Sequence, residues 1–340
     1  MKRILLIGAL LLVALLVVSV PAGIGWLIQN QARPALEQRL PGAAIDWQRG
    51  WFRSGVSIDD PDLDADIDFR HLTGSPPGWL AIDGRVLLTE PPTAIDLDGH
   101  VSLGLNGELD ATAPQLTHGD RVRWQHENPA LAIAARDNAL RIDASADTLR
   151  IDDPLGNRLV LANPDARVRV EESRERKLAV TLTLEGSRAG RQTSRAVVRM
   201  DGVDPNALEQ LVQGLGQVVW RGTDGAVGGL AAIGLASAWQ QLVAGGVALT
   251  LEELTLDGSL TLDGRWMPAD ESFSLAGNGE RDALLAWWST LEGLIRGVPP
   301  AEARASAERT LADFIDRDLV DVESDRLRVS VQSLPRPAGR

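Results

Sequence analysis

An almost unbroken apolar run opens the chain. Lys2 and Arg3 precede apolar residues from Ile4 to Val20, and the apolar character returns over 24–28. A helix needs about 20 apolar residues to cross a bilayer. Basic residues in front of such a helix stay in the cytoplasm, so the rest of the chain would lie outside it. The pattern predicts a single-pass transmembrane anchor over 1–30, with the C-terminal part of the chain on the outer side of the cytoplasmic membrane.

A cleaved secretory signal is the alternative interpretation of this segment. Such a signal has a basic start, an apolar stretch of roughly 7–15 residues and a small-residue cleavage site. Val20-Pro21-Ala22 could supply that site. Trp26, at the outer edge of the run, is typical of the aromatic belt beside a retained span. Both interpretations place the bulk of the protein outside the cytoplasmic membrane, and the retained anchor is favoured.

After a spacer over 31–44 the pattern changes to alternation. Every second residue over 60–68 is Asp, and the residues between are mainly apolar. In a strand this arrangement places carboxylates on one face and apolar side chains on the other. A calcium loop also uses alternate aspartates, but an EF-hand counted from Asp62 needs Gly and Glu where this chain has Ile67 and Thr73. The segment is therefore predicted to be a strand with a solvated face.

A nine-residue pattern occurs twice, at 95–103 and 254–262, with Asp-Gly at its centre between alternating apolar residues. Asp-Gly indicates a hairpin turn. A two-residue loop would mix the two faces of the sheet. A three-residue loop keeps the two faces apart by pairing Leu256 with Leu260. In the first copy the same loop would pair Leu97 with Val101. A single strand that passes through the glycine is equally consistent, and both alternatives predict antiparallel sheet with one apolar face.

Other alternating segments predict more strands of this kind, at 140–146, 167–170, 178–186 and 326–331. Helices are expected in the second half of the chain. Asp204 can cap one that has Pro205 at its first position. A second covers 282–296, with an expected buried set of Leu284, Trp287 or Trp288, Leu291 and Ile295. A third begins after Pro300, with an apolar side made of Ala307, Leu311, Phe314 and Ile315.

The segment over 225–251 contains no charged residue and is rich in small residues. Small residues spaced by four are typical of close helix packing in membranes. However, Gly, Ala and Ser dilute the hydrophobicity, and Gln240-Gln241 interrupt it. A helix or loop packed on the sheet is favoured, and a membrane-surface or partner contact and a second span are the alternatives.

Together these elements predict an α+β, strand-rich fold: an N-terminal transmembrane helix, then antiparallel meander sheet, with several helices in the C-terminal half. The expected regions are an antiparallel β-rich region over 45–200, a mixed helix and strand region over 201–334 packed on the same sheet, and a disordered tail over 335–340.

Composition narrows the function. The formal net charge of −13 disfavours nucleic acid and anionic lipid headgroups as partners. The absence of cysteine excludes disulfides, thiol catalysis and cysteine-based metal sites. The histidines match no metal-binding spacing, and no nucleophile elbow, P-loop or dinucleotide fingerprint is present. The four are His71, His100, His118 and His126. We therefore expect no enzyme, and no catalytic, cofactor-binding or metal-binding residue.

The segment Ile45-Asp-Trp-Gln-Arg-Gly-Trp-Phe-Arg-Ser54 resembles the YdgA-like family of bacterial proteins of unknown function. That family has one membrane-spanning segment, a spacer, an aromatic residue and then Gly-Trp-Phe-x-Ser leading into a strand. The resemblance implies a structural role for Gly50, Trp51 and Phe52, with the two aromatic side chains plugging the first strand into the core. This chain lacks the closing Asn-Gly of the family.

In outline the chain is also similar to AsmA-like envelope proteins, which share an anchor and Leu-x-Leu-x-Gly-x-Leu strands and are implicated in moving or organising lipids. The N component of type II secretion systems has a similar outline. These resemblances imply a single-pass protein of the bacterial inner membrane, with its C-terminal domain in the periplasm. They also imply a role in envelope maintenance or assembly, with either lipid binding in an apolar trough or scaffolding of envelope proteins as the activity.

Overall fold

The computed structural model describes residues 33, 37, 42–50, 53–61, 63–71, 78–89, 91–102, 106–119, 122–136, 138–173, 176–188, 191–211 and 225–332. The expected anchor over 1–30, most of the spacer and the expected tail over 335–340 lie outside these residues, as do Trp51 and Phe52. Within the described ranges, no helix is both long and apolar enough to cross a membrane.

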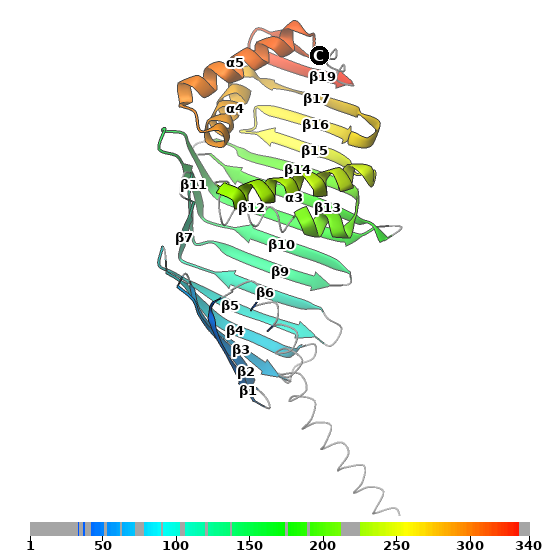
Figure 1. Ribbon diagram of the computed structural model, residues 1–340. Helices are drawn as coiled ribbons and strands as arrows, with labels where there is room; N and C mark the ends of the chain where they lie inside the picture. The colour runs from blue at the N-terminus through cyan, green and yellow to red at the C-terminus, as the bar shows by residue number, and fades with distance from the viewer. Residues whose placement is uncertain are drawn as a thin grey trace, which may run out of the picture. The chain divides into compact units, whose positions relative to one another are not determined.

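The chain divides into two units. Unit 1 comprises Met1–Pro114 and Ala130–Asp137, and unit 2 comprises Gln115–Pro129 and Asn138–Arg340. Both units are built from antiparallel strands, and the described helices α3, α4 and α5 belong to unit 2 (Figure 1). The strand-rich antiparallel architecture predicted from the alternating pattern is confirmed.

Unit 1 is an antiparallel sheet whose strands pair in succession. From one side of the sheet to the other they are β1 (Ala44–Arg49), β2 (Arg53–Asp59), β3 (Leu63–His71), β4 (Gly78–Leu88), β5 (Thr93–Ser102), β6 (Gly107–Thr112) and β9 (Ala130–Arg136). Val56, Ile58 and Ala65 are the buried centre of its apolar face. The alternating aspartates behave as predicted from Asp64 onward, but Asp60 precedes β3 and lies in a turn, where its N–H donates to the Leu63 carbonyl.

Unit 2 has a longer antiparallel sheet, in the order β7-β8-β11-β12-β13-β14-β15-β16-β17-β19-β18. The strands are β7 (Gln115–His118), β8 (Arg123–Glu127), β10 (Ala139–Ser145), β11 (Thr148–Asp152), β12 (Arg158–Glu172), β13 (Leu178–Ser187), β14 (Thr193–Val203), β15 (Ala248–Leu256), β16 (Leu260–Met267), β17 (Ser272–Glu280), β18 (Val320–Glu323) and β19 (Arg326–Gln332). The helices with complete described bounds are α3 (Gly225–Ala244), α4 (Arg281–Arg296) and α5 (Pro300–Asp316), with a short 3₁₀ turn η2 (Pro268–Asp270), and a further helix begins at Pro205.

Strand β12 is much longer than the segment over 167–170 that the pattern predicted. A bulge between Ala162 and Asp165 divides it, and Asn163 adopts a left-handed φ of 48° there. On one side, the first part of β12 pairs with β11 and the second part with β10. The bulge therefore lets one strand serve two short partners in succession.

The two copies of the nine-residue pattern fold differently. The second copy is the three-residue hairpin, with Leu256 opposite Leu260 and positive φ values at Asp257 (51°) and Gly258 (71°). The first copy is one continuous strand, β5, that passes through Gly99. A hairpin at the first copy is thus wrong. At Gly99 a Cβ atom would lie 2.6 Å from the Glu108 carbonyl oxygen, so the glycine there serves a close strand approach and not a turn.

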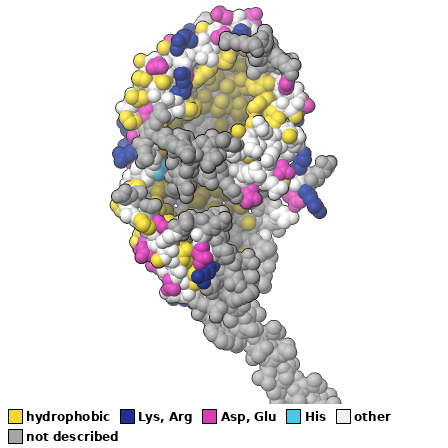
Figure 2. All heavy atoms as spheres, in the orientation of Figure 1, with side chains coloured by type: hydrophobic (Ala, Val, Ile, Leu, Met, Phe, Trp, Pro, Cys, Tyr) yellow, Lys and Arg dark blue, Asp and Glu magenta, His cyan; other side chains and the backbone are white. Residues whose placement is uncertain are grey.

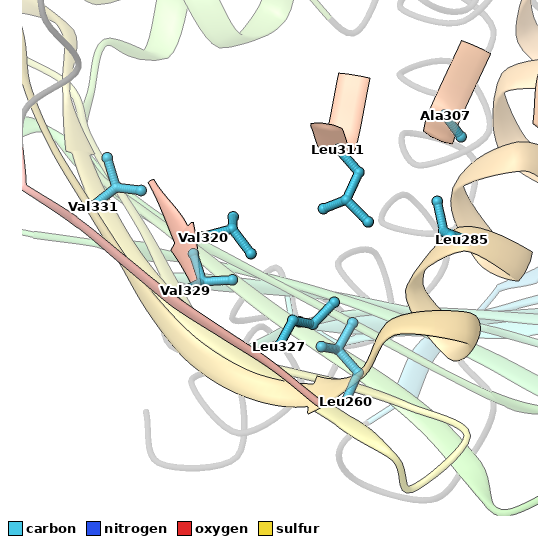
Figure 3. Packing of buried hydrophobic residues seen from close by; sticks show 8 residues of the cluster. All are labelled: Leu260, Leu285, Ala307, Leu311, Val320, Leu327, Val329 and Val331. Atoms are coloured by element: carbon cyan, nitrogen blue, oxygen red, sulfur yellow. The ribbon is translucent and has the colours of Figure 1, made fainter. Parts of the chain in front are cut away.

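One end of the unit 2 sheet packs against α4 and α5. Leu260, Val320, Leu327, Val329 and Val331 come from the strands, and they face three helix residues (Figure 3). The helix residues are Leu285, Ala307 and Leu311. The apolar side predicted for the third helix is confirmed, since Phe314 and Ile315 also pack on this cluster.

A second cluster lies where α3 and a helix beginning at Pro205 pack on the sheet. Val180, Val203, Ala207, Leu242 and Val247 are its buried members. The second half of the small-residue segment therefore packs on the sheet as predicted, through Trp239, Leu242 and Val247. The Asp204 carboxylate caps the other helix as predicted, accepting the N–H groups of Asn206 at 2.9 Å and Ala207 at 3.1 Å.

Replacing Asp204 by Ala is expected to lower the free energy of unfolding by about 1 kcal/mol, because two N–H groups at the helix start lose their acceptor. Urea denaturation followed by circular dichroism measures this loss. The variant Asp204→Asn is the control, since its amide oxygen keeps the acceptor. Equal stability of the Ala and Asn variants would show that the cap contributes nothing.

Helix α4 departs from the predicted buried set. Trp287 is buried as expected, and Leu285 and Leu294 are buried in place of Leu291 and Ile295. Leu291 is 42% exposed and Ile295 is 79% exposed. The predicted stripe is covered only in its first half, where Leu284 and Trp288 pack on the cluster with α5, whereas Trp287 and Leu294 face β11 and β12. The helix ends as predicted at Gly297, which has a φ of 62°.

Candidate functional site

The unit 2 sheet has an apolar face that is continuous in register. Two rows of side chains cross its strands. The first row consists of Leu182, Val198, Leu251, Gly264 and Leu275, and the second consists of Leu184, Ala196, Leu254, Leu262 and Gly277. We call these two rows the central band. Four strand spacings of about 4.8 Å give it a length of about 19 Å across the strands.

The opposite face of the unit 2 sheet carries ion pairs on β10, β12, β13 and β14. Arginine and acidic side chains alternate there, with pairs Arg141–Asp143, Arg167–Asp165, Arg169–Glu171, Arg195–Glu185 and Arg199–Asp201. Most of these side chains are substantially exposed, so solvent screens the pairs and each contributes little to stability. The contrast identifies this face as the solvated one.

The central band is not fully covered by the described helices. Six of its members lie outside the hydrophobic clusters that α3, α4 and α5 form with the sheet, namely Leu182, Leu184, Ala196, Val198, Leu251 and Leu254. Leu184 is 44% exposed, and the other five are half-buried. Figure 2 shows a hollow lined by hydrophobic side chains in the upper half of the view, where β15–β17 lie in Figure 1.

Glycines inside the strands help to bend this face. A Cβ atom on Gly264 would lie 2.6 Å from the Ser274 carbonyl oxygen, and one on Gly277 would collide with the Thr261 carbonyl. Neighbouring backbone thus occupies the space of a side chain, which is how glycine permits sharp curvature in a sheet. Both glycines belong to the central band, so the curvature and the apolar lining coincide.

An aromatic pair stands at one margin of the band. Trp266 on β16 lies opposite Leu249 and is 40% exposed, and its ring is 5.6 Å from that of Trp239 on α3. The other margin is formed by α4, whose Trp287 packs with Leu256. The band is therefore bordered by a helix on each side and contains no charged side chain.

Three aromatic rings stack on the edge strand β7 and its neighbour β8. The His118 ring lies 5.8 Å from that of Trp124 and 5.5 Å from that of His126, and the planes are nearly parallel. Burial lowers the pKa of His118. Burial, and then the neighbouring charge of His118, lower the pKa of His126. The folded protein therefore favours neutral imidazoles at both positions.

Because the folded-state pKa of each histidine is lowered, their contribution to stability is complete above about pH 6.5, the unfolded value, and is lost as the pH falls below it. A His126→Phe variant keeps an aromatic ring but cannot be protonated, so its stability is expected to fall less between pH 7.5 and pH 5.5. Urea denaturation at both pH values tests this. The stability of Trp124→Phe, which keeps both histidines and an aromatic ring at the third position of the stack, should fall as much as that of the unmodified protein.

Unit 1 carries a row of aspartates on its polar face. Asp68, Asp83, Asp98 and Asp110 lie directly opposite one another on β3 to β6. The Arg53 guanidinium donates to Asp68 at 2.9 Å, and this hydrogen bond lowers the pKa of the Asp68 carboxyl. Like charges opposite one another destabilise a sheet. The row gives this face a concentrated negative charge.

The remaining histidines do not join a site in the described ranges. His100 lies on the polar face of β5 opposite Glu108, as its place in the alternation predicts, and His71 is buried at the end of β3. In the part of the chain that the structure describes, no group of three or more His, Asp and Glu side chains is placed to hold a metal ion.

Sequence reasoning missed the stack on β7 and β8, because it searched for histidines at helical spacings. The eight-residue separation of His118 and His126 is the signal of a tight hairpin that places them diagonally across two strands. It also did not identify which apolar residues stay uncovered, since that depends on where the helices pack. Comparison with models of protein families, with curated proteins and with solved structures finds no match to this chain, and the YdgA-like resemblance stays a prediction.

Proposed function

We propose that this protein binds acyl chains of lipids on the central band of unit 2, as a non-enzymatic, single-pass protein of the bacterial inner membrane with its main part in the periplasm. Its role would be in maintenance or assembly of the cell envelope. The anchor over 1–30, inferred from the apolar run, would keep the band within reach of a lipid source.

The exposure of Leu184 within a continuous apolar lining carries this proposal. Removing apolar surface from water is favourable by about 25 cal/mol for each Å². An acyl chain that covers these aliphatic side chains gains this free energy without needing hydrogen bonds. The band offers no charged or hydrogen-bonding side chain that would select a polar ligand. Leu260, by contrast, is 1% exposed and belongs to the packed core, so it is no part of the binding surface.

Photo-crosslinking in living cells tests the proposal with the full chain. A benzophenone amino acid is placed at Leu184, and the matched control is Thr183, the preceding residue on β13, which faces the ion-paired side. We expect lipid adducts, identified by mass spectrometry of the digested protein, at position 184 and not at 183. Equal labelling at the two positions, or protein adducts alone at 184, would contradict acyl-chain binding.

A matched pair of substitutions gives a second measurement. Leu184→Asp introduces a charge into the band, while Thr183→Asp introduces the same charge on the polar face. Because Leu184 is already partly exposed, both variants are expected to fold with similar thermal midpoints. Only Leu184→Asp should lose copurifying lipid, measured by native mass spectrometry of the full chain.

A scaffold for other envelope proteins is the second candidate function, and the aspartate row of unit 1 favours it. A basic partner would relieve the repulsion among Asp83, Asp98 and Asp110. Replacing Asp83 and Asp98 with Asn should then abolish crosslinks to a partner protein and leave lipid adducts at Leu184 unchanged. Loss of neither would argue against the scaffold.

A further inference from the structure

We infer that one corner of unit 2 inserts into the acyl region of a lipid bilayer. The corner consists of Leu291 and Ile295 at the C-terminal end of α4, together with Leu155 in the turn between β11 and β12, and we call it the α4 corner. This inference goes beyond the proposed function and does not depend on whether the central band holds an acyl chain.

A buried polar contact fixes the turn against the helix end. Asn157 is buried, and its Nδ2 donates to the Val298 carbonyl at 2.7 Å and to the Asp153 carboxylate at 2.8 Å. Gly293 leaves the space that the Asn157 side chain fills. The turn and the last turn of α4 are therefore fastened together, and in Figure 1 β11 and α4 lie on the same side of unit 2, at the left of the view.

The backbone that carries Leu155 is equally fixed. The other carboxylate oxygen of Asp153 accepts the N–H groups of Leu155 and Asn157, each at 2.9 Å. Leu155 is nevertheless 46% exposed. The hydrogen bonds of the turn therefore hold the Leu155 side chain in an exposed position.

The helix contributes the rest of the apolar surface. Leu284 and Trp288 belong to the same stripe of α4 and pack on the cluster with α5, where the Trp288 ring lies 6.1 Å from that of Phe314. The stripe continues past this contact to Leu291 and Ile295, which remain exposed. Arg158, which follows Asn157 at the start of β12, is exposed and can donate hydrogen bonds to phosphate groups.

The size of the α4 corner identifies its occupant. Specific protein interfaces bury about 800 Å² on each partner, and three aliphatic side chains supply only a fraction of that area. A bilayer needs no such area, because each aliphatic side chain that enters the acyl region gains about 1.5–3 kcal/mol by itself. We therefore assign the corner to a lipid bilayer and not to a second copy of the chain or another protein.

The absence of cysteine makes a direct test possible. Ile295→Cys in the full chain is labelled with the environment-sensitive dye NBD and reconstituted into vesicles of phosphatidylethanolamine and phosphatidylglycerol, with or without doxyl-labelled lipid. Thr261→Cys, on the polar face of β16, is the matched control. We expect NBD at position 295 to emit at shorter wavelength and to lose most of its emission with doxyl lipid, while the dye at 261 changes in neither respect.

A second variant separates insertion from an effect of the dye. With NBD at Leu155→Cys, the substitutions Leu291→Ser and Ile295→Ser are expected to weaken doxyl quenching roughly tenfold each, with no change in thermal midpoint because both residues are exposed. Identical quenching at 295 and 261 would overturn the inference. So would a wavelength shift that needs no vesicles and grows with protein concentration, which would indicate a second copy. Lipid adducts at Leu184 report on the central band independently of either outcome.

Discussion

Replacing Arg188 with Met is expected to lower the free energy of unfolding of unit 2 by about 3 kcal/mol, because the change leaves a buried carboxylate without its countercharge. Arg188 follows β13, and its guanidinium lies 3.7 Å from the carboxylate of Asp257 in the β15–β16 hairpin. The Asp257 side chain is only 5% exposed. Water cannot replace the missing charge at that depth, and methionine preserves the aliphatic contacts of the arginine stem.

The surroundings of this pair explain why a hairpin forms at Asp257. The Ser194 hydroxyl donates to the Asp257 carboxylate at 3.3 Å and accepts the Asp257 N–H at 2.9 Å. The Arg188 guanidinium also lies over the Trp287 ring, 5.2 Å from its centroid, which joins α4 to the same contact. The Arg188–Asp257 pair thus connects the β15–β16 hairpin to β13, β14 and α4.

Tryptophan fluorescence during urea denaturation measures the loss, and a second substitution tests its cause. Asp257→Asn in the Arg188→Met background removes the uncompensated charge, so it should restore most of the stability. Arg195→Met is the control: its pairs with Glu185 and Glu253 lie on the solvated face, and at most about 1 kcal/mol is expected. If the two single arginine variants lose equal stability, the buried pair is not the reason for the hairpin.

Alternation along the strands was sufficient to predict the sheet. The predicted face of β3 and the pairing of Leu256 with Leu260 follow from the period of two, since a slip by one residue would exchange the faces. Asp-Gly was a less reliable guide. Asp83-Gly84 and Asp263-Gly264 lie inside β4 and β16, and at Gly84 a Cβ atom would lie 2.9 Å from the Asp66 carbonyl. A glycine needed for close strand approach and a glycine needed for a turn look the same in the sequence.

The side of α4 that is buried could not be predicted from its own residues. Leu284, Leu291 and Ile295 form one stripe, while Trp287 and Leu294, seven residues apart, form another, and both are apolar. Which stripe meets the sheet depends on a tertiary contact, the docking of Asn157 on the helix end. The central band was unpredictable for a similar reason, because periodicity identifies its apolar side chains but not the places where α3 and α4 leave them uncovered.

Replacing Gly293 with Ala is expected to destabilise the protein by about 3 kcal/mol, although alanine normally stabilises a helix interior by about 1 kcal/mol relative to glycine. The new Cβ atom would collide with the amide of Asn157. Because Asn157 is buried, the displaced amide would lose its bonds to Val298 and Asp153 with no water to replace them. Thermal and urea denaturation of the full chain measure the loss.

Gly234→Ala in α3 is the matched control. Gly234 is exposed, and no atom lies within 4 Å of where its Cβ would be, so this variant should gain up to about 1 kcal/mol. Asn157→Ala removes the group that Gly293 accommodates. In that background the alanine at 293 should cost nothing further, which gives a coupling energy of about 2–3 kcal/mol between the two positions. Should Gly293→Ala stabilise the protein as Gly234→Ala does, the turn is not docked on the helix end, and the α4 corner loses its rigid support.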